Sequence, residues 1–286
     1  MTPNQRGSLF MGAAMAAFSL EDALIKHAAT GMPVGQIMVF IGLFGLTAFS
    51  LQSLRAGVSP LPRQLVTKVM VIRSGFEIVG RVFYALAITH TPLTSASAIL
   101  QATPLLVVLG AAVMFGERVG AKRWALILMG LAGVMLIIRP SGSDFTPLSL
   151  LAVAGMIGFA GRDLATRAAR PNLSNAQLGS AGFLMLTLSG LLVMGFSPLK
   201  IPEPAALPAL FTAAIFATLG YAALTTAMRT GDVATVTPFR YTRLIFAMVF
   251  GVVLFGESPT HLTLIGAGLI VACGVALMRP HGQARR

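Results

Sequence analysis

The sequence predicts an all-α membrane protein with ten transmembrane helices, arranged as a 5+5 inverted repeat with both termini in the cytoplasm. Composition, the spacing of apolar segments and an internal repeat support this fold class. Of the 286 residues, 56% are hydrophobic and 10% are charged, whereas soluble proteins carry about 25% charged residues. The lipid bilayer is therefore the first partner that the sequence predicts.

Five apolar windows fill the first half of the chain, and each is long enough to cross a bilayer, which takes about 20 helical residues. They cover residues 7–29, 32–54, 65–89, 92–116 and 119–138. The first window could be a signal peptide, since Arg6 precedes it and small residues follow. We interpret it as a retained helix, because its apolar run continues past Glu21 and Asp22 and its pattern recurs later.

Five further windows fill the second half. They cover residues 147–169, 176–196, 205–228, 233–255 and 259–278. Pro104 in the fourth window and Pro238 in the ninth each remove an intrahelical hydrogen bond. These prolines either shape the packing or permit the bending that opens and closes a central path, as interrupted helices do in transporters.

The two halves repeat each other. The motif Phe115-Gly116-Glu117 recurs as Phe255-Gly256-Glu257, and Arg139-Pro140 recurs as Arg279-Pro280, both at a shift of 140 residues. Near the start of each half, Phe18, Asp22, Lys26 and Ala28 match Phe159, Asp163, Arg167 and Ala169 at a shift of 141. We therefore divide the chain into a first repeat, residues 1–142, and a second repeat, residues 143–286.

Positive charges predict how the repeats face. Because five helices are an odd number, the second copy must enter the membrane in the opposite orientation. Alternate loops on one side hold Arg6, Arg55, Arg63, Lys68, Arg118, Lys122, Arg123, Arg170, Arg229, Arg279, Arg285 and Arg286, and the other side holds little besides Arg139 and Lys200. By the positive-inside rule the richer side is cytoplasmic. The net charge of +12 thus reflects topology, and no soluble basic domain for nucleic acid is present.

Charged residues also lie within the predicted helices. Arg73, Glu77 and Arg81 follow one another at intervals of four residues in the third window, so they share one helical face near the middle of the bilayer. Such charges must face protein or water. Some of them can pair with one another. Because the arginines outnumber the buried acids, the excess favours a water-filled cavity that receives an anionic or zwitterionic ligand.

The candidate site residues follow from these charges and the aromatic residues beside them. For substrate binding we select Glu77, Arg81, Phe83, Tyr84, Gln101, Arg240, Tyr241 and Arg243, and for a coupling or structural charge network Glu21, Asp22, Arg73 and Asp163. Arg81 with Arg240 or Arg243 is expected to hold a carboxylate. Glu77 or Asp22 is expected to hold an ammonium group or a coupling proton, and the aromatic residues an apolar side chain.

Several kinds of activity lack their motifs. The sequence has no phosphate-binding loop, no metalloprotease or hydrolase motif, and no tight cluster of His and carboxylate side chains. The single Cys273 cannot form an internal disulfide. We therefore expect no catalytic site, no metal and no cofactor.

A family resemblance rests on five stretches of the sequence: the corners LFGE and FGERVGAKRW, and the segments GAAMAAFSLEDALIKHA, YALAITHTPLTSASAILQATPLL and ALMRP. These stretches resemble the drug/metabolite transporter superfamily, specifically its EamA type. The resemblance covers essentially the whole chain, and its layout is similar to bacterial amino-acid exporters, including those of YddG type. It implies a central cavity lined by helices 1, 3, 4, 6, 8 and 9, with helices 5 and 10 at the periphery.

The sequence therefore predicts a secondary transporter of the bacterial inner membrane that exports amino acids, with aromatic and other apolar ones favoured, or related small metabolites. Two alternatives stay open. One is import or exchange of a larger metabolite such as a vitamin or nucleotide derivative, and the other is a membrane-embedded enzyme or lipid-handling protein. The buried carboxylates allow proton coupling without requiring it.

Overall fold

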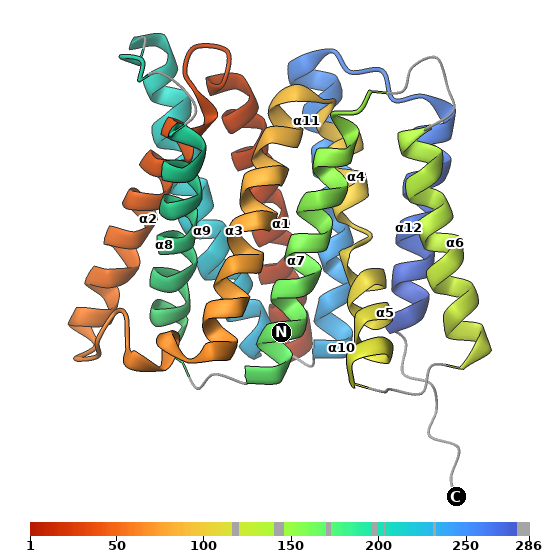
Figure 1. Cartoon of the computed structure of the whole chain (residues 1–286), viewed down its shortest axis with the longest axis horizontal. Coiled ribbons are helices and arrows are strands. Elements are labelled where there is room, and N and C mark those ends of the chain that lie inside the picture. The colour runs from red at the N-terminus through yellow and green to blue at the C-terminus, as the bar shows by residue number, and fades with distance from the viewer. Residues whose placement is uncertain are drawn as a thin grey trace, which may run out of the picture.

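The chain folds into a bundle of helices in a computed structural model that describes residues 1–115, 120–139, 146–169, 173–195, 199–202, 204–230 and 233–278. The described residues form helices and turns and contain no strand. In Figure 1 the long helices stand roughly parallel to one another, with α6 and α12 at one side of the bundle and α2 at the other. The first helix begins, and the last described helix ends, at the same edge of the bundle.

The helices follow the predicted windows to within a few residues at most ends. Their bounds are α1 (Pro3–Ala28), α2 (Val34–Arg55), η1 (Arg63–Val66), α3 (Lys68–His90), α4 (Leu93–Leu100), α5 (Thr103–Phe115), α6 (Ala121–Ile138), α7 (Ser149–Ala169), α8 (Asn175–Met194), η2 (Pro204–Ala206), α9 (Leu207–Thr230), α10 (Val233–Val236), η3 (Thr237–Tyr241), α11 (Thr242–Phe255) and α12 (His261–Met278).

Six stretches of the described chain are long and apolar enough to cross a membrane. They are α1, α2, α4 with most of α5, α8, α9, and η3 with α11. The helices α3 and α7 have similar lengths of 23 and 21 residues, but they carry several charges each. Shorter apolar helices lie within α6 and α12. The charges of α3 and α7 must therefore be shielded from lipid by the rest of the bundle.

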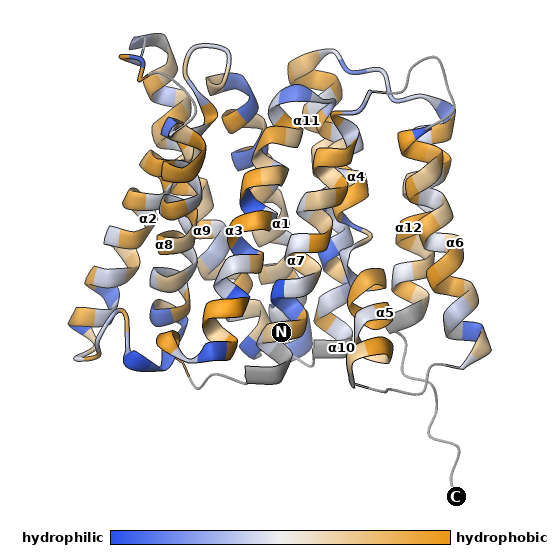
Figure 2. Cartoon of the chain, in the orientation of Figure 1, coloured by the Kyte–Doolittle hydropathy of each residue, from blue (hydrophilic) through white to orange (hydrophobic). Residues whose placement is uncertain are grey.

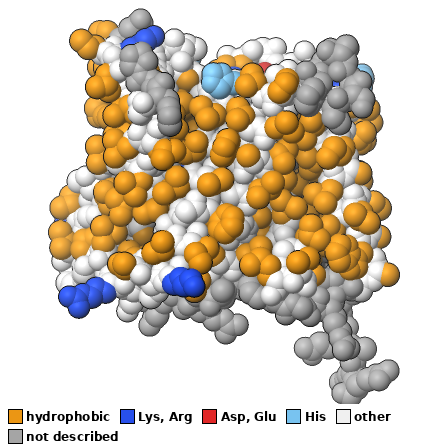
Figure 3. Space-filling model, in the orientation of Figure 1, with side chains coloured by type: hydrophobic (Ala, Val, Ile, Leu, Met, Phe, Trp, Pro, Cys, Tyr) orange, Lys and Arg blue, Asp and Glu red, His pale blue; other side chains and the backbone are white. Residues whose placement is uncertain are grey.

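The surface agrees with a membrane environment. Figure 3 shows a face dominated by hydrophobic side chains, with Lys and Arg visible only near its upper and lower edges. Figure 2 shows that hydrophilic residues also occur midway along the central helices. Many of the exposed large side chains are apolar, such as Ile245 at 61% and Leu219 at 56% exposure. A belt of this kind is stable only in contact with lipid.

Two of the predicted helices are broken. The fourth window forms α4 and α5 with a turn at Gln101 and Ala102 between them, and the ninth forms α10, η3 and α11. Pro104 lies in the first turn of α5 and Pro238 in the first turn of η3, where a missing backbone donor is tolerated. Both breaks fall inside the bundle, where neighbouring groups can satisfy the freed backbone atoms.

Helices from the two halves pack against one another in a regular pattern. The main pairs are α1 with α9, α2 with α8, α3 with α7, α6 with α12, and α4 with α11. We count α4 with α5, and α10 with α11, as one span each and exchange span 1 with span 6, span 2 with span 7, and so on. This exchange turns the α1–α9 pair into the α3–α7 pair, and it leaves the α2–α8, α4–α11 and α6–α12 pairs unchanged. An approximate two-fold axis between the halves would produce this pattern.

Glycines allow one of these pairs to approach closely. A Cβ atom added to Gly158 on α7 would lie 2.4 Å from the backbone nitrogen of Gly80 on α3. The two backbones are thus in direct contact, as small residues permit in membrane helices. This contact places the charged face of α3 against α7.

The second FGE corner joins three elements. Gly256 ends α11 with a positive φ of 62°, a conformation that suits glycine. The Glu257 carboxylate then accepts hydrogen bonds from the backbone nitrogens of Leu93 (2.5 Å) and Thr94 (3.0 Å) at the start of α4, and lies 3.2 Å from Lys26 Nζ of α1. Glu257 thus caps the N-terminus of α4 and links α1 to the C-terminal end of α11. The equivalent corner, residues 116–119, lies outside the described residues.

Candidate functional site

Arg73, Glu77 and Arg81 on α3, which we call the charged ladder, form ion pairs with one another. Arg73 Nη1 lies 2.8 Å and Arg81 Nη2 lies 3.2 Å from the two oxygens of Glu77, which is 1% exposed. Arg73 Nε also donates to Thr166 Oγ1 of α7 at 2.8 Å. Glu77 therefore holds two arginines in place and has little capacity left for a ligand.

Asp22 on α1 forms a second set. Its Oδ2 accepts hydrogen bonds from Arg243 Nη2 of α11 at 2.7 Å and from the Tyr84 hydroxyl of α3 at 2.9 Å. The Arg243 guanidinium also lies over the rings of Phe18 and Tyr84, 5.4 Å and 5.5 Å from their centroids. These contacts tie together helices from both halves of the chain.

A third pair lies on α7. Arg162 donates from Nε and Nη2 to Asp163 Oδ1 at 2.9 Å and 2.8 Å, and its guanidinium stacks over Phe159 at 4.9 Å from the ring centroid. The pair joins neighbouring residues of one helix, so it neutralises charge without linking helices.

These charged groups surround a central cavity of about 200 Å³. Its lining side chains come from α1, α2, α3, the α4–α5 break, α7, α8, α9 and the η3–α11 segment. Among the described residues of α6 and α12, none lines it. This set contains the six helices that the resemblance implied. It adds α2 and α8, which contribute Met38, Phe183 and Leu186.

The two broken helices meet at this cavity. Gln101, in the turn between α4 and α5, donates from Nε2 to the backbone carbonyl of Arg240 in η3 at 2.9 Å. Both residues line the cavity, together with Pro104 and Tyr241. A polar site at broken helices near mid-membrane is the arrangement that many secondary transporters use to bind substrate.

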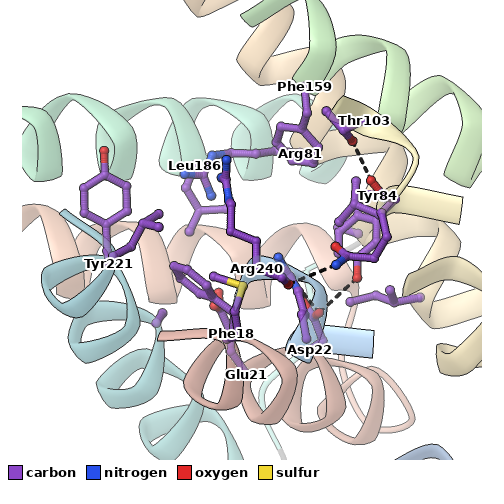
Figure 4. Close-up of a pocket in the computed structure, with 18 of the residues that line it drawn as sticks. Phe18, Glu21, Asp22, Arg81, Tyr84, Thr103, Phe159, Leu186, Tyr221 and Arg240 are labelled. Carbon is purple, nitrogen blue, oxygen red and sulfur yellow. Dashed lines mark hydrogen bonds and ion pairs between the residues drawn. The ribbon is translucent and has the colours of Figure 1, made fainter. Parts of the chain in front are cut away.

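Two charged side chains of the cavity have no such partner. Within the part of the chain that the structure describes, neither the Glu21 carboxylate nor the Arg240 guanidinium makes a hydrogen bond or an ion pair. In Figure 4 the Arg240 side chain extends into the middle of the cavity, between Tyr221 and Tyr84, and Glu21 lies near Phe18 below it. Asp163 also lines the cavity, and its ion pair is with Arg162.

Aromatic and aliphatic side chains form the remaining wall. Phe18, Phe159, Phe183 and Tyr221 all line the cavity. The rings of Phe183 and Tyr221 lie 5.8 Å apart in an edge-to-face contact, and the Tyr221 hydroxyl donates to the Leu178 carbonyl at 2.9 Å. The cavity therefore combines charged groups with an apolar surface, as small-molecule sites commonly do.

Most of the residues selected from the sequence line this cavity. They are Arg81, Tyr84, Gln101, Arg240, Tyr241, Arg243, Glu21, Asp22 and Asp163. Phe83, Glu77 and Arg73 do not line it. Among the described residues, the structure contains no group of three or more His, Cys, Asp or Glu side chains that could hold a metal ion.

Some lining residues were not selected. Arg162 and Phe159 line the cavity, as do Thr103, Phe183 and Leu186. The repeat offered a signal for Phe159, since it matches Phe18 at a shift of 141. Nothing in the sequence distinguishes Phe183 or Leu186 from other apolar residues that face lipid.

Comparison with known proteins gives matches along the whole chain. The model of the EamA-like transporter family matches residues 5–139 and again residues 147–279. The pseudopaline exporter CntI of Pseudomonas aeruginosa is 28% identical over 92% of each chain. A riboflavin transporter of Rhizobium johnstonii is 27% identical over 98% of this chain and 93% of its own.

A more distant relative is an S-adenosylmethionine uptake transporter of Rickettsia bellii, which is 24% identical over 71% of this chain and 69% of its own. A solved crystal structure matches 95% of this chain and 96% of its own, with a TM-score of 0.65 and 23% identity. That likeness establishes a shared fold and leaves the substrate open.

Proposed function

Because this chain belongs to the EamA-like transporter family, we propose that it is a secondary transporter of the bacterial inner membrane that exports amino acids or related small metabolites by alternating access. Its transport role and multi-pass membrane nature follow from the family and the apolar helices. The substrate, the direction and the location in the inner membrane are the proposed parts.

One observation carries the proposal, namely the polar cavity at the two helix breaks. A bundle that needed only stable packing could fill this space with apolar side chains. Instead, charged groups surround it, including the unpartnered Glu21 and Arg240. Buried charges without partners are costly in a membrane, so a hydrated cavity that receives a charged substrate accounts for them.

We also propose that the two halves are inverted repeats, residues 1–142 and 143–286, with both termini in the cytoplasm. Three findings support this arrangement: the family model matches the chain twice, the helix pairs persist when the halves are exchanged, and α1 begins at the edge where α12 ends (Figure 1). In such a transporter one repeat rocks against the other and exposes the central site to each side in turn.

The site residues in this proposal are those that line the cavity. Polar groups of Arg81, Gln101, Arg240 and Arg243 would orient the substrate, and Tyr84, Tyr241 and the phenylalanine side chains would contact its apolar part. This division favours amino acids with apolar or aromatic side chains. The ion pair of Asp22 with Arg243 would keep α1 and α11 in register. Glu77 would hold Arg73 in position for its hydrogen bond to Thr166 of α7.

Import or exchange of a larger organic metabolite is the second candidate. Several relatives favour it, since they are named as riboflavin transporters and S-adenosylmethionine uptake transporters. A membrane enzyme is the third candidate, and chemical turnover of a bound metabolite would identify it.

Counterflow in proteoliposomes tests these candidates together. Vesicles loaded with one unlabelled compound from a panel of amino acids, vitamins and nucleotide derivatives are diluted into the labelled compound, with and without a pH gradient. We expect transient accumulation of at least one amino acid or related metabolite, and less accumulation with Arg240→Gln. Accumulation of only vitamins or nucleotide derivatives would favour the second candidate, and none above protein-free vesicles would refute transport of the panel.

A further inference from the structure

We propose that Glu21 and Arg240 form a recognition pair for a zwitterionic substrate, with Glu21 binding its cationic group and Arg240 its anionic group. This inference rests on the proposed transport function and specifies the chemical class that the central cavity accepts. It also differs from the selection made from the sequence, which gave the ammonium group to Glu77 or Asp22.

Elimination among the acids leads to Glu21. Five carboxylate side chains belong to the described residues, and four of them already have cationic partners. Asp22 binds Arg243, Glu77 binds Arg73 and Arg81, Asp163 binds Arg162, and Glu257 binds Lys26. Within that part of the chain, Glu21 alone makes no ion pair or hydrogen bond, although it lines the cavity.

The same comparison among the cavity arginines leads to Arg240. Arg81, Arg162 and Arg243 each donate to a carboxylate. In the described chain the Arg240 guanidinium has no hydrogen-bond acceptor, while its backbone carbonyl is fixed by Gln101. The main chain of Arg240 is therefore anchored at the helix break, and its side chain extends into the cavity (Figure 4).

Glu21 and Arg240 lie on neighbouring elements, since α1 packs against η3. Their opposite charges nevertheless do not form an ion pair with each other. A ligand with both a cationic and an anionic group would pair with Glu21 and Arg240 at the same time. A ligand with a single charge would leave either the Glu21 carboxylate or the Arg240 guanidinium desolvated and without a hydrogen-bonded ionic partner when the cavity closes.

The surroundings restrict the ligand further. Phe18 precedes Glu21 by about one turn of α1, and Phe159 and Tyr221 line the same cavity. An aromatic or aliphatic group attached to the zwitterion can pack against these rings. Apolar α-amino acids and compounds built from them have this combination of groups.

Three probes test the pair on the full-length protein in detergent: L-phenylalanine, N-acetyl-L-phenylalanine, which has no cationic group, and L-phenylalaninamide, which has no anionic group. The affinity for each is measured by ligand-induced thermal stabilisation. We expect the wild type to prefer L-phenylalanine over both blocked probes by about 10- to 100-fold, the effect of one charge-assisted hydrogen-bonded contact.

The variants separate the two contacts. Glu21→Gln should abolish the preference over the N-acetyl probe and keep the preference over the amide. Arg240→Gln should do the reverse. Arg55→Gln, at the exposed end of α2, removes one positive charge outside the cavity and should keep both preferences. Because each variant is compared across probes, a general loss of stability cannot produce the crossed pattern.

Two results would overturn the inference while leaving transport intact: preferences that do not respond to either variant, or counterflow of only neutral or singly charged compounds. A wild type that binds none of the three probes and shows no counterflow of any compound in the panel would overturn the inference and the proposed function together.

Discussion

Glu77 stabilises the bundle at the scale of a single residue. Its carboxylate neutralises Arg73 and Arg81, each at a separation of four residues, and it is almost completely buried. Removing one partner of a buried ion pair leaves an uncompensated charge. Glu77 thus contributes to the fold by holding two arginines that would otherwise be isolated beside α7.

We therefore expect Glu77→Gln to destabilise the protein by about 3 to 5 kcal/mol, the usual effect of breaking a buried pair. The measurement is the thermal midpoint of unfolding in detergent. Arg55→Gln, which changes an exposed side chain, serves as the matched charge control and should leave the midpoint unchanged. An unaltered midpoint for Glu77→Gln would show that the ladder has no structural role.

The sequence identified most charged residues of the cavity but could not divide them into paired and free ones. Glu21 and Asp22 are adjacent, so their side chains leave α1 about 100° apart, and only the position of Arg243 decides which of them is paired. That position depends on packing between residues 221 apart in the chain. Helical periodicity carries no information on such a distant partner.

At the scale of an element, the close approach of α3 and α7 depends on glycine. Replacing Gly158 by alanine would place a methyl group 2.4 Å from the Gly80 nitrogen, so the helices must separate. Gly155, Gly158 and Gly161 recur every three residues along one window, a pattern of small residues that is typical of closely packed membrane helices.

Gly158→Ala should therefore lower stability by about 1 to 3 kcal/mol, as overpacking does in a close-packed interior. Gly12→Ala on α1 is the matched control, since an added Cβ there meets no heavy atom within 4 Å, and it should be neutral or slightly stabilising. Both variants are compared by the thermal midpoint in detergent, and equal midpoints for the two would contradict the close packing.

The helix breaks were only partly predictable. The sequence marked Pro104 and Pro238 as points of weakness, and each lies at a break. It did not locate the turn at Gln101 and Ala102, because nothing local prevents these residues from being helical. The hydrogen bond from Gln101 to the Arg240 carbonyl supports this turn, and that contact again depends on the distant half of the chain.

At the scale of the whole molecule, the apolar windows and the internal repeat predicted most of the helices. These features are local or self-similar, so one sequence is sufficient to detect them. The pairing of α1 with α9 and of α3 with α7 could not be derived in the same way, because a hydrophobic surface that faces lipid resembles one that faces another helix. The inverted topology and the cytoplasmic termini remain predictions.

The central claim is that a water-accessible substrate cavity lies within the bundle, and two single-cysteine variants on a Cys273→Ser background test it most directly. Leu224 of α9 lines the cavity and is partly exposed, whereas Leu219 of the same helix is 56% exposed on the outer surface. A membrane-impermeant maleimide reacts with hydrated thiols, so we expect it to label Leu224→Cys in intact membranes, more slowly when substrate is present, and to leave Leu219→Cys unlabelled. Failure to label Leu224→Cys from either side of the membrane would contradict the account.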